Sequence, residues 1–188
     1  GFLRLYISRG IGSEGYFPKK NIKPLLIIST SDPVPNITSE IILGLAKMRK
    51  NSINYEFENY KFAQGLQNSL VKMQAVEDGF FDAILLNEKD EICETSSANI
   101  FWFKGDQLFT PSHKCGLLLG TIRQKIIENS KVDIVLAGIE VLQEADEIVL
   151  TNVRIGILPV QELSFSKKIY VYKKTIILQK NLDKWLTS

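Results

Sequence analysis

Short apolar segments separated by polar turns fill the middle of this sequence, and they constrain its fold more than any other feature. The segments have the length of strands and are rich in branched and aromatic residues: "FDAILLN", "EICE", "NIFWFK" and "QLFTP". Two polar turns, "EKDE" and "KGDQ", divide them. We therefore predict a meander of short strands in this region.

Strands and helices are predicted to alternate in the rest of the chain. Two strands, "LRLYISRG" and "KPLLIIST", enclose a loop that contains Gly10, Gly12 and Gly15. The segment "TSEIILGLAKMRK" is interpreted as a surface helix or turn. Farther along, strands are predicted at "VDIVLAGI" and "EIVLTNV", and helices at "TIRQKIIENS", "VLQEADE" and "KKTIILQKNLDKWL".

A helix is also predicted from Lys61 onward. Its apolar residues recur three or four positions apart: Phe62, Leu66, Leu70, Met73 and Val76. Gly79 ends the pattern, as glycine commonly ends helices.

Composition limits the class of protein. Hydrophobic residues make up 45% of the 188-residue chain, and no repeat or long linker occurs, so residues 1–188 are treated as one domain. The 23 Lys and Arg residues balance 21 Asp and Glu residues without a basic run, which argues against nucleic acid as a partner. The apolar stretches are much shorter than the roughly 20 residues that cross a bilayer. A soluble, cytoplasmic protein without a membrane partner is expected.

Familiar catalytic signatures are missing from the sequence. His113 is the only histidine, so Ser-His-Asp or Cys-His chemistry would have to use it. No phosphate loop of the Walker type, dinucleotide fingerprint or HExxH motif occurs. Cys93 and Cys115 lack the spacing of a metal site, so no metal is expected and both are predicted to be reduced thiols.

Glu94 precedes a strongly apolar run in "CETSSANIFWF". An uncompensated buried carboxylate is costly, so an acid buried here would need a cationic partner. The alternative is an ordinary turn residue at a strand edge.

Two other features admit a special and an ordinary interpretation. Gly120 leads into a helix whose first amides, at Thr121 and Ile122, lack intrahelical acceptors, and such an end suits a phosphate. Lys61 at a helix start opposes the helix dipole, which hints at another use. An ordinary helix start and a solvated lysine are the alternatives.

Taken in order, these features resemble the class IV pyridoxal-phosphate enzymes, which include branched-chain and D-amino-acid aminotransferases and aminodeoxychorismate lyases. The family pattern is a lysine, a glutamate about 33 residues later, and a set of short motifs. Here Lys61 precedes Glu94 by 33 residues, and the motifs are "ETSSANIF", "TP", "LLGTIR", "ADEIVLTN" and "PV". The opening "YISRGIGSEGY" is also similar to the family.

The resemblance implies an α+β fold: the large domain of the D-amino-acid aminotransferase-like fold, a mixed sheet or pseudo-barrel flanked by helices. It implies that residues 1–188 are this cofactor-binding large domain and that the smaller N-terminal domain is absent. It also implies pyridoxal 5'-phosphate as cofactor, a small-molecule amino substrate and a homodimer.

The resemblance assigns roles to individual residues. Lys61 would form the Schiff base with the cofactor and shuttle protons as the catalytic residue. Glu94 would face the pyridine nitrogen, so that the cofactor itself would be its cationic partner. Leu118 would pack on the ring, and Arg9 would recognise a substrate carboxylate.

The phosphate would be held by the start of a helix, at Gly120, Thr121 and Ile122, and Asn152 and Val153 would complete the cofactor site. Two departures weaken this part of the pattern. "GTIR" inverts the commoner "GITR" and moves the hydroxyl to Thr121, and Val153 replaces a residue that often carries a hydroxyl.

The subfamily is predicted from a few positions. Branched-chain aminotransferases usually have a tyrosine five residues after the lysine, where this chain has Leu66, and "ANIFWFKGDQLFTP" is similar to the lyases. We therefore expect a 4-amino-4-deoxychorismate lyase of folate synthesis, which releases pyruvate and forms 4-aminobenzoate. The alternatives are a D-amino-acid or branched-chain aminotransferase and a catalytically degenerate fragment.

Overall fold

A computed structural model describes residues 1–12, 17, 19–33, 37, 40–50, 60–166 and 168–187. Gly15 and the end of "YISRGIGSEGY" lie outside the described residues. The chain divides into two compact units, residues 1–38 and 39–188. Each unit is described by itself, and the assignment of residues 1–188 to a single large domain stays a prediction.

The first unit is a β-hairpin. Strand β1 (Phe2–Ser8) pairs antiparallel with β2 (Leu25–Ser31), so both predicted strands are confirmed. Gly10 has φ of 99°, and a β-carbon there would lie 2.0 Å from the carbonyl oxygen of Lys23, so both the backbone angle and the space require glycine.

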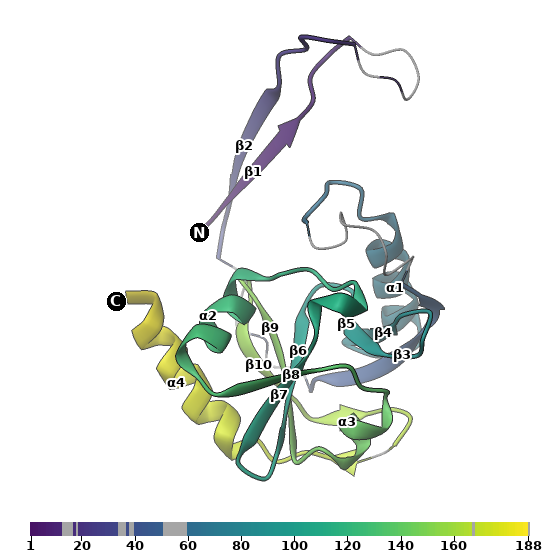
Figure 1. Ribbon diagram of the computed structural model, residues 1–188, viewed down its shortest axis with the longest axis vertical. Helices are drawn as coiled ribbons and strands as arrows, with labels where there is room; N and C mark the ends of the chain where they lie inside the picture. The colour runs from purple at the N-terminus through teal and green to yellow at the C-terminus, as the bar shows by residue number, and fades with distance from the viewer. Residues whose placement is uncertain are drawn as a thin grey trace. The chain divides into compact units, whose positions relative to one another are not determined.

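The second unit contains two five-stranded sheets (Figure 1). The β3 sheet has the order β12-β11-β3-β4-β5, with strands β3 (Ile42–Arg49), β4 (Asp82–Leu86), β5 (Ile92–Thr95), β11 (Glu162–Leu163) and β12 (Lys168–Ile169). The β6 sheet has the order β10-β9-β6-β7-β8, with strands β6 (Asn99–Lys104), β7 (Gln107–Pro111), β8 (Val132–Val135), β9 (Glu147–Asn152) and β10 (Gly156–Val160).

The predicted strands of the central region are confirmed, but the single meander is wrong. The chain passes from the β3 sheet to the β6 sheet in a tight turn between β5 and β6, where the amide of Thr95 donates to the carbonyl of Ala98 at 2.8 Å. Strand β6 lies between β7 and β9, and β4 lies between β3 and β5. Pairings between distant segments therefore replace part of the local meander.

The prediction of a surface helix or turn at "TSEIILGLAKMRK" is wrong, because this segment forms β3, a parallel partner of both β4 and β11. Leu43 and Ala46 are buried in it. A β-carbon on Gly44 would lie 2.4 Å from the ring of Phe80, so a close tertiary contact passes over this strand. Tertiary packing overrides the helix-favouring composition of the segment.

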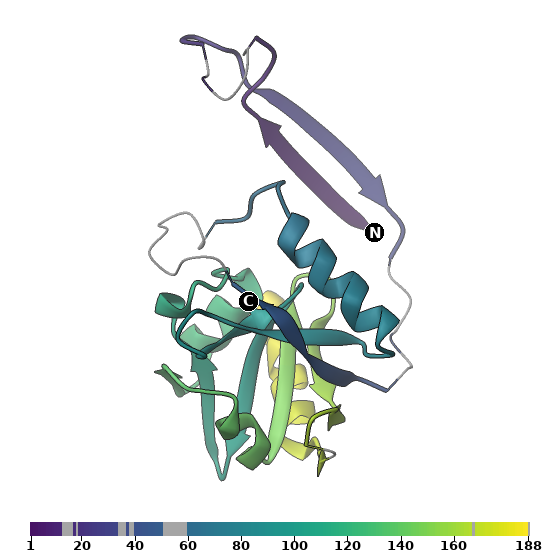
Figure 2. The same cartoon turned by 90° about the vertical axis from the view of Figure 1, so that its right-hand side faces the viewer.

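Four α-helices are described in the second unit: α1 (Leu66–Glu77), α2 (Thr121–Asn129), α3 (Glu140–Glu144) and α4 (Lys173–Thr187). Helix α1 packs on β3 and β4, whereas α2 and α4 cover the β6 sheet (Figures 1 and 2). A 3-10 turn, η2 (His113–Cys115), follows β7. Among the described residues, no helix combines the length and apolar character that crossing a membrane requires.

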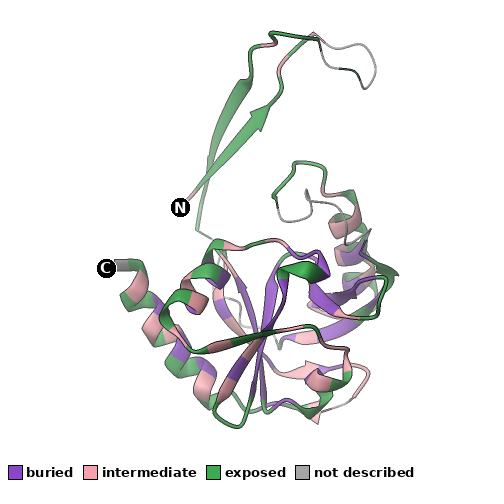
Figure 3. Cartoon of the chain, viewed as in Figure 1, coloured by how far each residue is buried: buried purple, intermediate pink, exposed green. Residues whose placement is uncertain are grey.

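A core cluster of apolar side chains joins the β6 sheet to α2 and α4. Phe101, Ile126 and Val149 are fully buried there, and Leu178 and Leu182 supply the packing face of α4. The central strands are buried, whereas the outer turns of α4 are exposed (Figure 3). This core fixes the position of the start of α2.

Helix α1 begins at Leu66, so the prediction that Lys61 heads this helix is wrong. Its buried residues are Val71 and Ala75, which pack with Ala46 and Ala83. The apolar residues that predicted the helix are exposed: Leu66, Leu70, Met73 and Val76. Small side chains rather than large ones therefore make the contact with the β3 sheet.

Candidate active site

Glu94 lies on β5, with 5% of its surface exposed, and hydrogen-bond donors hold both of its carboxylate oxygens. Nζ of Lys50 forms an ion pair with Oε1. The backbone amide of Leu118 donates to Oε2 at 3.0 Å, and Nδ2 of Asn99 donates to the same oxygen at 3.4 Å. The buried carboxylate thus has the cationic partner that its burial requires.

Lys50 is the residue that sequence reasoning missed, because the expected partner of Glu94 was a cofactor. Lys50 directly follows β3, and its amide donates to the carbonyl of Leu86 at 2.8 Å. The preceding segment was predicted to be a helix or turn, and no local pattern connects positions 50 and 94. The only available signal was that a buried acid needs a cation.

Asp82 supports the turn that follows Glu94. It is fully buried, its Oδ1 accepts from the amide of Ser96 at 3.2 Å, and its Oδ2 accepts from the hydroxyl of Ser97 at 3.1 Å. Asn68 adds a bond from Nδ2 to the carbonyl of Ser96 at 2.6 Å. These contacts hold the turn in place beside the carboxylate.

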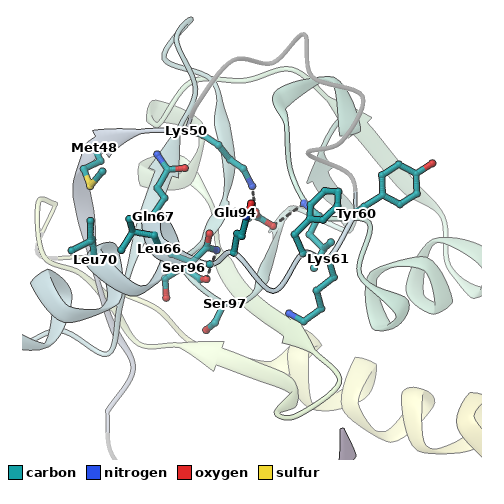
Figure 4. Close-up of a pocket in the computed structure, with 15 residues that line it drawn as sticks. Met48, Lys50, Tyr60, Lys61, Leu66, Gln67, Leu70, Glu94, Ser96 and Ser97 are labelled. Carbon is teal, nitrogen blue, oxygen red and sulfur yellow. Dashed lines mark hydrogen bonds and ion pairs between the residues drawn. The ribbon is translucent and has the colours of Figure 1, made fainter. Parts of the chain in front are cut away.

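A cavity of about 600 Å³ opens beside Glu94, and Lys50, Lys61, Ser96 and Leu118 are among the residues that line it. Its volume falls within the range of small-molecule sites. Figure 4 shows Lys50 directed at Glu94 and the amine of Lys61 turned away from that carboxylate. The structure thus brings the predicted lysine and the predicted acid to one cavity.

Lys61 is exposed and lies in a non-helical segment five residues before α1. The field of a helix terminus falls off within one turn, so the expected influence of the helix end on this amine does not apply. Exposure leaves the amine accessible to a ligand in the cavity.

The predicted helix after Gly120 is confirmed as α2, with Gly120 as its N-cap. Gly120 offers no side chain to the first amides of the helix, which include those of Thr121 and Ile122. Thr121 is exposed, whereas the side chain of Ile122 is buried in the core. This helix start follows Leu118 by two residues, but Gly120, Thr121 and Ile122 are not among the described residues that line the cavity, and their phosphate-binding roles stay predictions.

Asn152 is the last residue of both the predicted motif and β9, and Val153 follows it. Nδ2 of Asn152 donates to the carbonyl of Ser97 at 2.9 Å, so Asn152 also supports the turn beyond Glu94. Val153 is 73% exposed. Neither is among the described residues that line the cavity, and their cofactor-binding roles stay predictions. Arg9 belongs to the first unit, and its role in substrate binding also stays a prediction.

Arg123 is a buried cation near the site. Its Nη2 donates to the carbonyl of Pro111 at 2.9 Å, and within the described structure its Nε has no hydrogen-bond partner. Burial lowers the pKa of this guanidinium, and the charges of Cys115 and Glu94 oppose that shift. Arg123 therefore adds positive potential behind the carboxylate.

Comparison with known proteins identifies the family. Residues 1–163 match the amino-transferase class IV family. The chain is 28% identical over 193 residues to an aminodeoxychorismate lyase from Vibrio harveyi, covering 96% of this chain and 71% of the relative. It is 30% identical over 176 residues to a putative branched-chain-amino-acid aminotransferase from Methanocaldococcus jannaschii, covering 86% of this chain and 58% of that protein.

A solved structure has the same fold: the T.th. branched-chain amino acid aminotransferase complexed with N-(5'-phosphopyridoxyl)-L-glutamate. The TM-score is 0.85 at 20% identity, with 97% of this chain and 62% of that chain covered. The chain therefore belongs to the amino-transferase class IV family, whose enzymes depend on pyridoxal phosphate. The predicted α+β class and fold are confirmed.

Proposed function

We propose that Lys61 and Glu94 form the two ends of a pyridoxal 5'-phosphate site in the cavity of the second unit. The observation that carries the proposal is that an accessible amine and a buried carboxylate line the same cavity of about 600 Å³. An amine can bond to an aldehyde, and a carboxylate can accept a hydrogen bond from a protonated ring nitrogen. The two groups supply complementary chemistry for this cofactor.

Other residues fit the remaining parts of the cofactor. The apolar side chain of Leu118 would contact the ring, and the amides of Thr121 and Ile122 would bind the phosphate. The hydroxyl oxygen of Ser96, which is buried in the cavity wall, has no hydrogen-bond partner in the described structure. A polar ligand would satisfy this oxygen only after the Ser96 side chain turns toward the cavity.

Pyridoxal phosphate supplies, when bound, a conjugated ring that draws electron density from the substrate bond that breaks. Lys61 would anchor the cofactor and, when its amine is free, would take a proton from the substrate carbon that carries the amino group and deliver it to the departing pyruvate group. Glu94, oriented by Asn99 and the amide of Leu118, would accept the hydrogen bond of the ring nitrogen.

We propose aminodeoxychorismate lyase as the activity, with release of pyruvate and formation of 4-aminobenzoate. The likeness to the Vibrio harveyi lyase supports it. Leu66 lines the cavity at the position where branched-chain aminotransferases usually have a tyrosine. That residues 1–188 form the cofactor-binding large domain of the family, and that the protein is a cytoplasmic homodimer, are parts of the same proposal.

An aminotransferase is the second candidate. The 30% identity to the Methanocaldococcus jannaschii relative favours it, and the same lysine would serve its proton transfer. A degenerate chain without catalysis is the third. The exposed Val153, which offers no hydroxyl to a phosphate, supports that alternative.

Cofactor binding can be tested on the full chain. Addition of pyridoxal phosphate should produce a new absorbance band, and reduction with borohydride should fix the label on the peptide that contains Lys61. The matched variants are Lys61→Ala, which should lose the label, and Lys50→Arg, which should keep it. A label on Lys50, or no label in any variant, would overturn the assignment.

The reaction can be tested separately. Incubation with 4-amino-4-deoxychorismate should yield pyruvate and 4-aminobenzoate in equal amounts. Amino transfer from D- or branched-chain amino acids to 2-oxoglutarate should be much slower. The reverse result would establish the aminotransferase, whereas a labelled protein without either activity would support the degenerate alternative.

A further inference from the structure

Lys50 is buried in a way that is unusual for lysine. Only 5% of its surface is exposed, whereas lysine side chains ordinarily keep the ammonium group in water. Its backbone is fixed by the hydrogen bond to Leu86, and an irregularity in the pairing of β3 with β4 lies just before it, between Leu45 and Arg49. Such irregularities redirect side chains, and this one precedes a side chain that points at Glu94.

The carboxylate of Glu94 is held from two sides by different kinds of donor. Oε2 accepts two neutral donors, the amide of Leu118 and the Asn99 side chain. Oε1 accepts the charged Nζ of Lys50. A carboxylate has about four lone-pair sites, so these three donors leave one acceptor site on Glu94, which is among the residues that line the cavity.

We propose that Lys50 is a positioning residue for Glu94, which keeps the carboxylate ionised and oriented so that it can accept a hydrogen bond from a protonated heterocycle in the cavity. This inference rests on the proposed function. It assigns a role to a residue outside the lysine and glutamate of the family pattern. Without the ammonium group, the donors to Glu94 seen in the structure would be neutral, and a buried carboxylate with neutral donors takes up a proton more readily.

The other charged and titratable groups around Glu94 do not replace Lys50 in this role. The charge of Glu94 raises the pKa of Arg123, but Nη2 of Arg123 donates its hydrogen bond to the carbonyl of Pro111. Lys61 lines the cavity with its amine directed away from the carboxylate. Burial raises the pKa of the Cys93 thiol, so this neighbour stays neutral. Burial likewise raises the pKa of Cys115 to about 11.

Two substitutions separate the charge of Lys50 from its bulk. Lys50→Gln keeps a hydrogen-bond donor but removes the charge, and Lys50→Arg keeps the charge. The ligand is pyridoxine 5'-phosphate, which has the ring nitrogen and the phosphate but no aldehyde. It therefore forms no covalent bond with the amine of Lys61. The dissociation constant is measured from pH 6 to pH 8.5. At each pH, the dissociation constant of a variant is divided by that of the wild type, which cancels the effect of the ligand's phosphate titration.

Lys50→Gln should bind pyridoxine 5'-phosphate progressively more weakly than the wild type as the pH falls. The ratio of the two dissociation constants should rise by about tenfold per pH unit once Glu94 is protonated in the free variant. The Arg variant should keep a constant ratio to the wild type. A merely structural role of Lys50 would weaken binding equally at every pH, and that result would overturn the proposal.

A ligand-free measurement tests the same inference directly. Protein labelled with ¹³C at the glutamate side-chain carboxyl is titrated, and Glu94→Gln identifies the signal. Glu94 should take up a proton at higher pH in Lys50→Gln than in the wild type, and an unchanged titration would refute the role of Lys50. If the wild type fails to bind pyridoxine 5'-phosphate but the Glu94 signal shifts in Lys50→Gln, the proposed function fails and the pairing stands.

If Lys50→Gln does not fold, the wild type and Lys50→Arg decide the matter. A wild-type Glu94 that is already protonated at neutral pH would overturn the proposal. Ionised Glu94 in both proteins, with equal ligand affinity, would support it.

Discussion

A β-carbon on Gly120 would lie 2.2 Å from Oδ1 of Asn99, so the start of α2 approaches β6 too closely for a larger residue. Asn99 uses its other polar atom, Nδ2, to bond to the carbonyl of Leu118 at 2.8 Å and to Glu94 at 3.4 Å. The close contact at Gly120 therefore involves Asn99, the same side chain that orients Glu94. The cap of α2 and the carboxylate form one packed arrangement.

Gly120→Ala should displace Asn99 and disturb Glu94. Overpacking of this kind costs about 1–3 kcal/mol in the free energy of unfolding. Affinity for pyridoxine 5'-phosphate should fall as well. Urea denaturation and ligand titration measure the two effects. The control for stability is Gly65→Ala, where no described residue other than the chain neighbours has an atom within 4 Å of the added β-carbon and the expected change is about 0.5 kcal/mol. Equal effects of the two substitutions would contradict the argument.

Asp82→Ala should destabilise the chain, because the buried amide of Ser96 would lose the acceptor that Oδ1 supplies. A buried donor left without an acceptor costs about 2 kcal/mol in the free energy of unfolding. The matched control is Asp106→Ala, which breaks an exposed ion pair with Lys174 worth about 0.5 kcal/mol or less. Urea denaturation should separate the two variants, and similar midpoints would show that Asp82 does not support the turn.

Leu182→Ala and Ile177→Ala test which face of α4 packs on the β6 sheet. Leu182 is 3% exposed in the core cluster, so its truncation should cost about 2–5 kcal/mol. Ile177 is 60% exposed, and its truncation should change the free energy of unfolding by about 0.5 kcal/mol or less. Thermal or urea unfolding of the pair provides the measurement. A larger loss at Ile177 would mean that α4 is rotated relative to this structure.

Stability should decline at alkaline pH through Cys115. Burial raises the pKa of this thiol from its ordinary value of 9.0 to about 11. Because the folded-state pKa lies above the unfolded one, this contribution to stability is fully present below pH 9 and is lost as the pH rises toward 11. Urea midpoints from pH 7.5 to pH 11 measure the decline. Cys115→Ala, normalised to its own value at pH 7.5, should decline less steeply, and parallel curves would exclude the thiol as a cause.

The sequence determined those parts of the molecule that depend on local patterns. Short apolar runs and turn residues predicted β4 to β7, and the glycine at the helix start together with the apolar spacing predicted α2, because these signals act over a few residues. The ordered motifs from Lys61 to Val160 also indicated the family. Helical spacing predicted α1, although its start and its packing face differ from the prediction.

Only the tertiary structure decided which distant residues meet. The composition of β3 favours a helix, but its parallel pairing with β4 and β11 makes it a strand, and hydrogen bonds to distant strands leave no signal in the local sequence. The ion pair between Lys50 and Glu94 joins positions 44 residues apart. A buried acid needs a cationic partner. Lys50 is that partner because it directly follows β3, in the same sheet as the β5 strand that carries Glu94. Local motifs therefore predicted Lys61 and Glu94, whereas only the tertiary structure showed that Lys50 pairs with Glu94.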